Sequence, residues 1–383
     1  MAALMMRKAG LLAKTEVTEG TDPTPTAGTN GVLVSNVRVT PNPNVIRTNE
    51  VTPSLDPFDS IVGGMWIGLA FDVYLKGNGT PGTAPEWAVL LKACGWSETI
   101  TATAVPPTAE ALGGGGTTLI ATLGATAVGT SQLYRGMPIQ FTSAVTLDSF
   151  IRNYNAGKVA TLTDTASGSL TGTTSYQIPV NVLYSPASTT IPSVTFYFYN
   201  DGIRYVMVGA RGNATFRLES GGPGVISFDF RCMFVSKTDV ALPTITYDTT
   251  RPPIWKGGSF TINQVASAGA AMTLDCGNQL TNPDNPNATE GFDPAVITMR
   301  NMQGTINPNE TLIATRDIMN DFRTQTKRPL HAHFGSTAGN RVGLTIPSAL
   351  YTGSTPGDRN GIRIVDVQWD ATGQDAGGFC AIW

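Results

Sequence analysis

The sequence predicts a mostly β protein, and three observations support this. The chain has 383 residues with 42 glycines and 25 prolines, above ordinary usage but without a collagen-like period. Thr, Val and aromatic residues fill the space between these turn formers, which favours many short strands joined by turns. Several segments also alternate between apolar and polar residues, the period of a half-buried strand. At this length the chain can hold two domains and bury a substantial core.

The charge and cysteine content narrow the class of protein. The formal net charge is -3 and only 14% of residues are charged, too balanced for a surface that wraps nucleic acid. No run of about 18 apolar residues occurs, so we expect no membrane-spanning helix, and the N-terminus lacks the features of a signal peptide. The four cysteines are far apart in sequence, which favours buried free thiols in a reducing cytoplasm.

The first 50 residues contain few regular patterns. An amphipathic piece, Leu4–Lys14, precedes a Pro/Thr/Gly-rich arm, Thr21–Asn30. Together these residues offer too little apolar surface to fold alone, so we expect them to pack on a neighbouring subunit. A strand is predicted at Val32–Thr40, and the prolines and asparagines of Pro41–Pro57 favour an extended loop.

The clearest strand is Met65–Lys76, which places an apolar residue at every odd position and Asp72 on the opposite face. A short helix is predicted at Pro85–Cys94, because Thr83 can cap it and Gly95 can end it.

Further strands are predicted at Leu133–Thr142 and Ser175–Tyr184. Val194–Val208 indicates a hairpin, since two aromatic runs flank Asn200-Asp201-Gly202. Val225–Val235 alternates again, with Asp229 and Arg231 opposite its aromatic face.

A similar order of signals recurs beyond a proline-bounded linker, Leu242–Pro253. The predicted elements are strands at Ser259–Gln264, Ala271–Cys276 and Ala295–Met302, a helix at Glu310–Thr326, and strands at Leu330–Phe334, Val342–Pro347 and Gly361–Asp370. This recurrence of pattern, without recurrence of residues, predicts an internal duplication. We therefore divide the chain into residues 1–45 (N-terminal arm and first strand), 46–245 (first domain) and 246–383 (second domain). The alternative is one enlarged domain.

No stretch carries the signature of a catalytic or cofactor site. Gly113–Gly116 lacks the lysine of a phosphate-binding loop, and Asn282–Glu290 lacks the order of a calcium-binding EF-hand loop. His331 and His333, the only histidines, would share a strand face, but no third metal ligand is evident. We expect no catalytic residues, no metal site and no cofactor.

Three stretches resemble the tail tube proteins of long-tailed bacteriophages. They are LLAKTEVTEGTDPTPT (Leu11–Thr26), APEWAVLLKACGW (Ala84–Trp96) and YNDGIRYVMVGARGNATFRLESGGPGVISFDF (Tyr199–Phe230), with weaker support from GFDPAVITMR (Gly291–Arg300) and GDRNGIRIVDVQW (Gly357–Trp369). Residues Val105–Ser131 have no counterpart in this resemblance.

The resemblance implies a tail-tube-type β-sandwich or barrel with a flanking helix, duplicated within the chain. It implies a structural virion protein, without enzyme activity, that polymerises as stacked rings into a hollow tail tube, in a siphophage type of particle. Genome DNA would pass through it without sequence-specific binding. The implied partners are other copies of the chain and the tail terminator, distal tail and tape-measure proteins, with assembly in the host cytoplasm.

The bore and the ring symmetry give further expectations. A wall rich in lysine and arginine would hold DNA phosphates, so a neutral or acidic wall is expected. Asp72, Asp229 and Arg231 are candidates for this wall because they lie opposite the core faces of their strands; the alternative is that they lie at subunit contacts.

Three duplicated chains would make a ring of six domains, and six chains with one enlarged domain each are the alternative.

Two other classes of function compete with this one. A phage-encoded carbohydrate-binding or adhesin module is the main alternative, because β-sandwiches with Trp and Tyr on their loops bind sugars. A β-fold hydrolase is disfavoured, since the sequence shows no nucleophile or metal constellation.

Overall fold

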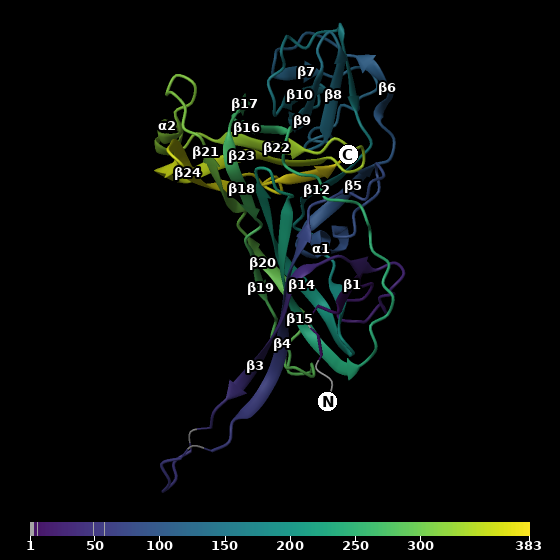
Figure 1. Ribbon diagram of the computed structural model, residues 1–383, viewed down its shortest axis with the longest axis vertical. Coiled ribbons are helices and arrows are strands. Elements are labelled where there is room, and N and C mark those ends of the chain that lie inside the picture. The colour runs from purple at the N-terminus through teal and green to yellow at the C-terminus, as the bar shows by residue number, and fades with distance from the viewer. Residues whose placement is uncertain (1–3, 6, 49, 57) are drawn as a thin grey trace.

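The computed structural model describes residues 4, 5, 7–48, 50–56 and 58–383. Within these residues it has 25 strands and two short helices, so the predicted mostly β fold is confirmed. Figure 1 shows an elongated molecule from which one long hairpin, β3–β4, projects. A single hydrophobic core extends through most of the body, from Leu11 near one end of the chain to Ile382 at the other.

The first half of the chain (residues 9–239, apart from an insertion) is one set of antiparallel strands. Its pairings follow the order β3-β4-β15-β14-β13-β1-β2. The antiparallel pair β5–β12 and helix α1 complete it. The bounds are β1 (Ala9–Thr15), β2 (Gly31–Val32), β3 (Ser35–Ile46), β4 (Ile61–Tyr74), α1 (Ala88–Ala93), β5 (Trp96–Thr101), β12 (Asn181–Pro186), β13 (Val194–Asn200), β14 (Ile203–Glu219) and β15 (Val225–Asp239).

The second half (residues 259–382) repeats this order of pairing. Its strands follow β18-β21-β24-β23-β22-β16-β17, and helix α2 follows β21 as α1 follows β4. The bounds are β16 (Ser259–Ile262), β17 (Val265–Ala266), β18 (Gly269–Asp275), β19 (Asn278–Thr281), β20 (Val296–Arg300), β21 (Gln303–Pro308), α2 (Ile318–Arg323), β22 (Arg328–Phe334), β23 (Val342–Arg359), β24 (Ile362–Ala371) and β25 (Phe379–Ile382).

The correspondence extends to an irregularity in the ladder. The β13–β14 hairpin contains a bulge between Val194 and Phe196, and the β22–β23 hairpin contains one between Arg328 and Leu330. In both hairpins one residue of the first strand faces two of the second. Because a bulge is a specific local feature, its recurrence sets the alignment of the two halves.

The two halves are joined within one sheet. β14 pairs with β18, which brings Thr215 opposite Asp275, and β12 pairs with β25, which brings Val182 opposite Ile382. The linker at 242–253 lies outside any strand. The β-ladder is therefore continuous across the linker that separates the halves in sequence.

An insertion, residues 105–178, forms a separate six-stranded sheet in the order β6-β11-β8-β9-β10-β7. It has its own hydrophobic cluster and lies at the end of the molecule opposite the projecting hairpin (Figure 1). The stretch Val105–Ser131, which had no counterpart in the resemblance, belongs to it. The bounds are β6 (Val105–Ala111), β7 (Ile120–Thr122), β8 (Pro138–Ser143), β9 (Leu147–Tyr154), β10 (Val159–Leu162) and β11 (Thr174–Ile178).

The N-terminal residues pack on their own chain, so the expectation that they need a neighbouring subunit was wrong. β1 pairs with β13 along its whole length, and Leu11 and Leu12 are fully buried. The buried carboxylate of Glu16 accepts hydrogen bonds from the hydroxyls of Ser193 and Thr195. Residues 1–3 and 6 lie outside the described part of the chain.

Several predicted boundaries also differ from the structure. Helix α2 begins only after Asp317, whose side chain caps it at 2.9 Å from the backbone N–H of Asn320, so the predicted start at Glu310 was wrong. The proline-rich residues 41–46 continue β3 rather than forming a loop. They are tolerated because β3 is an edge strand within this chain, where a missing N–H breaks no ladder bond. Pro57 lies outside the described residues.

Candidate functional site

One face of the sheet is polar across both halves, and we call it the polar face. It is formed by eight strands in the order β3-β4-β15-β14-β18-β21-β24-β23. Along β15 the even positions from 226 to 232 are buried, whereas Ser227, Asp229 and Arg231 are turned away from the core. The buried side holds packed aromatic rings, among them Phe71 and Phe230 with centroids 5.9 Å apart. Strict alternation thus separates an aromatic core from a polar surface.

Asp72, Asp229 and Arg231, which were predicted to lie opposite the core faces of their strands, lie together on the polar face. The register places Ser227 opposite Asp72, and Asp229 and Arg231 follow along the same face of β15. The alternation in the sequence correctly predicted on which face of its strand each side chain lies. That β4 and β15 are neighbours follows only from the pairing of strands in the tertiary structure.

Asp72 is fixed by a cluster of donors. Asn36 Nδ2 donates to it at 2.8 Å and Arg217 Nη2 at 3.1 Å, and the Ser227 hydroxyl donates as well. Burial alone would raise the pKa of Asp72, but these hydrogen bonds and the Arg217 charge outweigh it, and the pKa lies below its ordinary 3.8. Asp72 is therefore an ionised, oriented carboxylate.

Asp229 and Arg231 form the neighbouring part of the face. Burial raises the pKa of Asp229, and the charges of Arg38 and Arg231 only partly oppose this shift. The Arg231 guanidinium lies over the Trp66 ring, 4.1 Å from its centroid. Arg231 is thus held by an aromatic ring, and Arg217 on the same face is paired with the Asp72 carboxylate.

The second half presents carboxylates and hydroxyls at the corresponding places. Thr273 and Thr305 join β18 to β21 through a 2.9 Å contact between their hydroxyl oxygens. Asp275, Asp366 and Asp370 carry the negative charges of this half of the face.

Each half also has a shallow hollow at the same location. The first is lined by residues of β3, β4, β14 and β15, including Asp72, Thr215 and Asp229. The second is lined by residues of the four corresponding strands β18, β21, β23 and β24, including Thr355 and Asp366. The structural repeat therefore includes a shallow hollow at the same place on each half.

The cysteines do not contribute a reactive site. All four are free and buried, as the sequence predicted. Burial raises the pKa of the Cys276 thiol to about 12, so this thiol is protonated and inert at neutral pH. In the part of the chain that the structure describes, no helix has the length and apolar character needed to cross a membrane.

Comparison with known proteins agrees with this architecture. A family model described as "Phage tail tube protein" matches residues 6–371. No curated protein matches the chain significantly. The matched residues cover nearly the whole sequence and include every strand of the polar face. The chain belongs to the phage tail tube protein family.

Proposed function

We propose that the chain polymerises as stacked rings into the hollow tail tube of a siphophage-type virion, through which genome DNA passes. It acts as a structural element without catalysis, is assembled in the host cytoplasm, and contacts the tail terminator, distal tail and tape-measure proteins. Membership of the tail tube family supports this proposal.

The observation that carries the ring proposal is the repeated strand order with one free edge at each end. The halves are joined by β14 of the first and β18 of the second. By the correspondence between halves, β23 is the counterpart of β14, and β3 is the counterpart of β18. Among the described residues, β3 and the segment of β23 from 355 to 359 each have a ladder partner on one side only.

These two edges fit each other in a defined register. We compared the two halves by following the paired residues from strand to strand. In this comparison Thr355 occupies the position in the second half that Thr215 occupies in the first, and Thr40 occupies the position in the first half that Asp275 occupies in the second. Thr355 of one chain would thus face Thr40 of the next. Pro41 and Pro356 lie on either side of this pair, and neither offers an N–H to the ladder.

Three chains closed in this way give six equivalent halves and leave no exposed sheet edge around the ring. The proposed tube domains are residues 46–245 and 246–383, and residues 1–45 contribute β1, β2 and most of β3 to the first. Six chains per ring remain the alternative.

The polar face is proposed as the wall of the bore, with Asp72, Asp229 and Arg231 among its residues. Arg231 is stacked on Trp66 and flanked by Asp229, so its charge is partly neutralised. The carboxylates of the second half repel phosphates. Such a wall lets DNA slide, because few free cations are available to replace its counterions.

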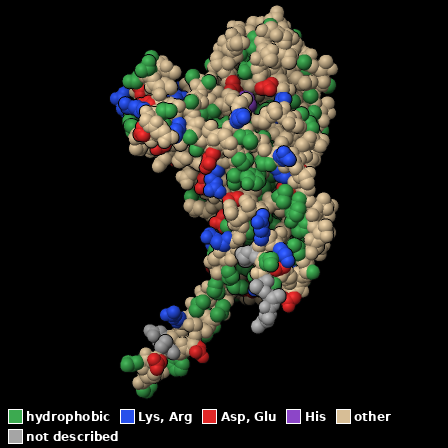
Figure 2. Space-filling model, viewed as in Figure 1, with side chains coloured by type: hydrophobic (Ala, Val, Ile, Leu, Met, Phe, Trp, Pro, Cys, Tyr) green, Lys and Arg blue, Asp and Glu red, His purple; other side chains and the backbone are tan. Residues whose placement is uncertain are grey.

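The projecting β3–β4 hairpin is proposed to contact the adjacent ring. Figure 2 shows apolar side chains along this hairpin, which extends away from the body. At its tip Val51 and Leu55 are fully exposed, and Phe58 and Ile61 are about half exposed. An apolar tip of this kind marks a protein contact rather than a solvated surface.

A cysteine-pair experiment tests the edge register and the symmetry together. Thr40→Cys with Thr355→Cys puts Cα atoms about 4.5–5.5 Å apart across the proposed ladder, within disulfide range. Asn42→Cys with Thr355→Cys is the matched control, since a diagonal pair is about 7–8 Å apart and out of range.

On a non-reducing gel of oxidised tubes, the first pair should give cross-linked bands of up to three chains. The control pair should give no such bands. A ladder ending at six chains would support the six-chain ring. Equal cross-linking of both pairs would contradict the register. A purified chain that stays discrete and never forms tubes under the electron microscope would contradict the tube function and favour the adhesin alternative.

A further inference from the structure

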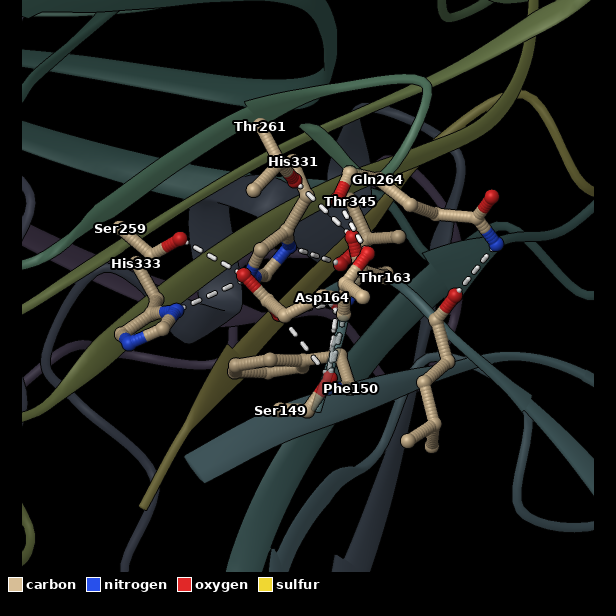
Figure 3. Close-up of polar contacts among 12 residues, drawn as sticks. Ser149, Phe150, Thr163, Asp164, Ser259, Thr261, Gln264, His331, His333 and Thr345 are labelled. Carbon is tan, nitrogen blue, oxygen red and sulfur yellow. Dashed lines mark hydrogen bonds and ion pairs between the residues drawn. The ribbon is translucent and has the colours of Figure 1, made fainter. Parts of the chain in front are cut away.

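The two histidines of the chain meet a carboxylate from a distant part of the sequence. Figure 3 shows His331 and His333 on β22 together with Asp164, which follows β10 of the insertion. One candidate ligand atom from each residue lies within 4.8 Å of the other two. The sequence offered no third ligand for the histidines, and the docking of the insertion supplies one.

The spacing of these atoms suits a small metal ion. His331 Nε2 lies 3.0 Å from His333 Nδ1 and 4.0 Å from Asp164 Oδ2. Ligand atoms of a tetrahedral zinc ion are roughly 3.3 Å apart, given its bond lengths of about 2.0–2.2 Å. Only small side-chain movements would bring all three atoms to that spacing.

The surrounding hydrogen bonds orient the ligands as metal sites require. His331 Nδ1 lies 2.8 Å from the Thr345 hydroxyl, which can accept its N–H and leave Nε2 free for a metal. The Asp164 carboxylate accepts from the hydroxyls of Ser149 at 2.9 Å and Ser259 at 2.6 Å. Such outer partners hold a carboxylate and an imidazole in fixed directions.

The charge balance of the site also favours a cation. Asp164 is buried, and its one ion-pair contact among the described residues is with His331. The neutral form of an imidazole is the form that binds metals. Among the described residues, no lysine or arginine forms an ion pair with Asp164, and a buried carboxylate without such a partner is short of positive charge.

We propose that Asp164, His331 and His333 bind one Zn²⁺ ion, with water as the fourth ligand on the partly exposed side of His333. Two imidazoles and one carboxylate are a ligand set that zinc accepts in four-coordinate sites. The ion would fasten the insertion to β22 of the second half. At this contact Thr261 already donates to the carbonyl of Thr163 at 3.0 Å, and Gln264 to that of Leu162 at 2.9 Å.

The test uses the full chain without a histidine tag, so that His331 and His333 are its only imidazoles. The protein is dialysed with ZnCl₂ and then in zinc-free buffer, and bound metal is measured by mass spectrometry. Affinity follows from competition with a chelator. Substitution of Co²⁺ gives an absorption band that reports tetrahedral coordination.

We expect one zinc per chain in the native protein and none in His333→Gln, whose site at the edge of the cluster permits folding. Thr345→Val should weaken zinc affinity about 10–100-fold by removing the outer partner of His331. Asp148→Asn is the matched control, because this carboxylate acts on His333 electrostatically but is outside the cluster, and it should retain one zinc.

Failure of the native chain to retain zinc, or equal retention by His333→Gln, would overturn the proposal. The readout is metal content and does not depend on tube assembly, so the tube function can stand or fall separately.

Discussion

The structure predicts that strand β1 is an internal support of the fold, and the substitution Leu11→Ala tests this. Leu11 is fully buried in the main core, and its strand is paired with β13 on one side and with β2 on the other. Truncating the side chain removes buried apolar contacts and leaves a cavity that this doubly paired strand cannot easily close.

The expected cost follows from comparable core truncations. Leu→Ala at a fully buried site lowers the free energy of unfolding by about 2–5 kcal/mol. Val17 lies just beyond the end of β1 and is 98% exposed, so Val17→Ala should change that free energy by about 0.5 kcal/mol or less. The two substitutions thus differ mainly in burial.

Urea unfolding of unassembled subunits, followed by tryptophan fluorescence, measures the difference. Leu11→Ala should shift the midpoint to lower urea without changing the slope, while Val17→Ala should match the native chain. A chain beginning at Gly31 lacks β1 and Glu16 and should show no cooperative transition. Equal midpoints for the two substitutions, or cooperative unfolding of the truncated chain, would refute the assignment of β1 to the core.

Two further predictions concern charged groups. Because the pKa of Asp72 is lowered in the folded chain, its ionised form stabilises the fold above about pH 4, and this contribution is lost as pH falls through the folded pKa. Asp72→Asn should therefore lower the urea midpoint at pH 6 but by progressively less toward pH 3, and a pH-independent difference would contradict this reasoning. Lys76 is buried, with its Nζ 3.4 Å from Glu86 and 3.5 Å from Asp248. Lys76→Met should cost about 3–5 kcal/mol by leaving both carboxylates unpaired. Lys8→Met, at a site 62% exposed, is the control, and equal stability of the two variants would exclude a structural role for the buried pair.

Local patterns in the sequence determined much of the fold. Alternation over Met65–Lys76 and Val225–Val235 identified β4 and β15 and placed Asp72, Asp229 and Arg231 on the faces away from the core. Asp201 and Gly202 both adopt positive φ, so the turn residues correctly predicted the β13–β14 hairpin. These features depend on a residue and its near neighbours, and such information is present in the sequence.

Other features were decided only by contacts between distant segments. The short run Ala9–Thr15 has no clear alternation, and it is a strand because β13 and β2 enclose it. Helix α2 is shorter than its pattern suggested, and it begins after Asp317, whose side chain caps it.

The two proposed sites show the same limit most clearly. Asp164 reaches His331 and His333 only because the insertion docks on β16 and β22. The polar face is continuous only because β14 pairs with β18 across the linker. Hydrogen-bond ladders and side-chain clusters join residues that are far apart along the chain, whereas periodicity reports only which way each side chain points within its own strand.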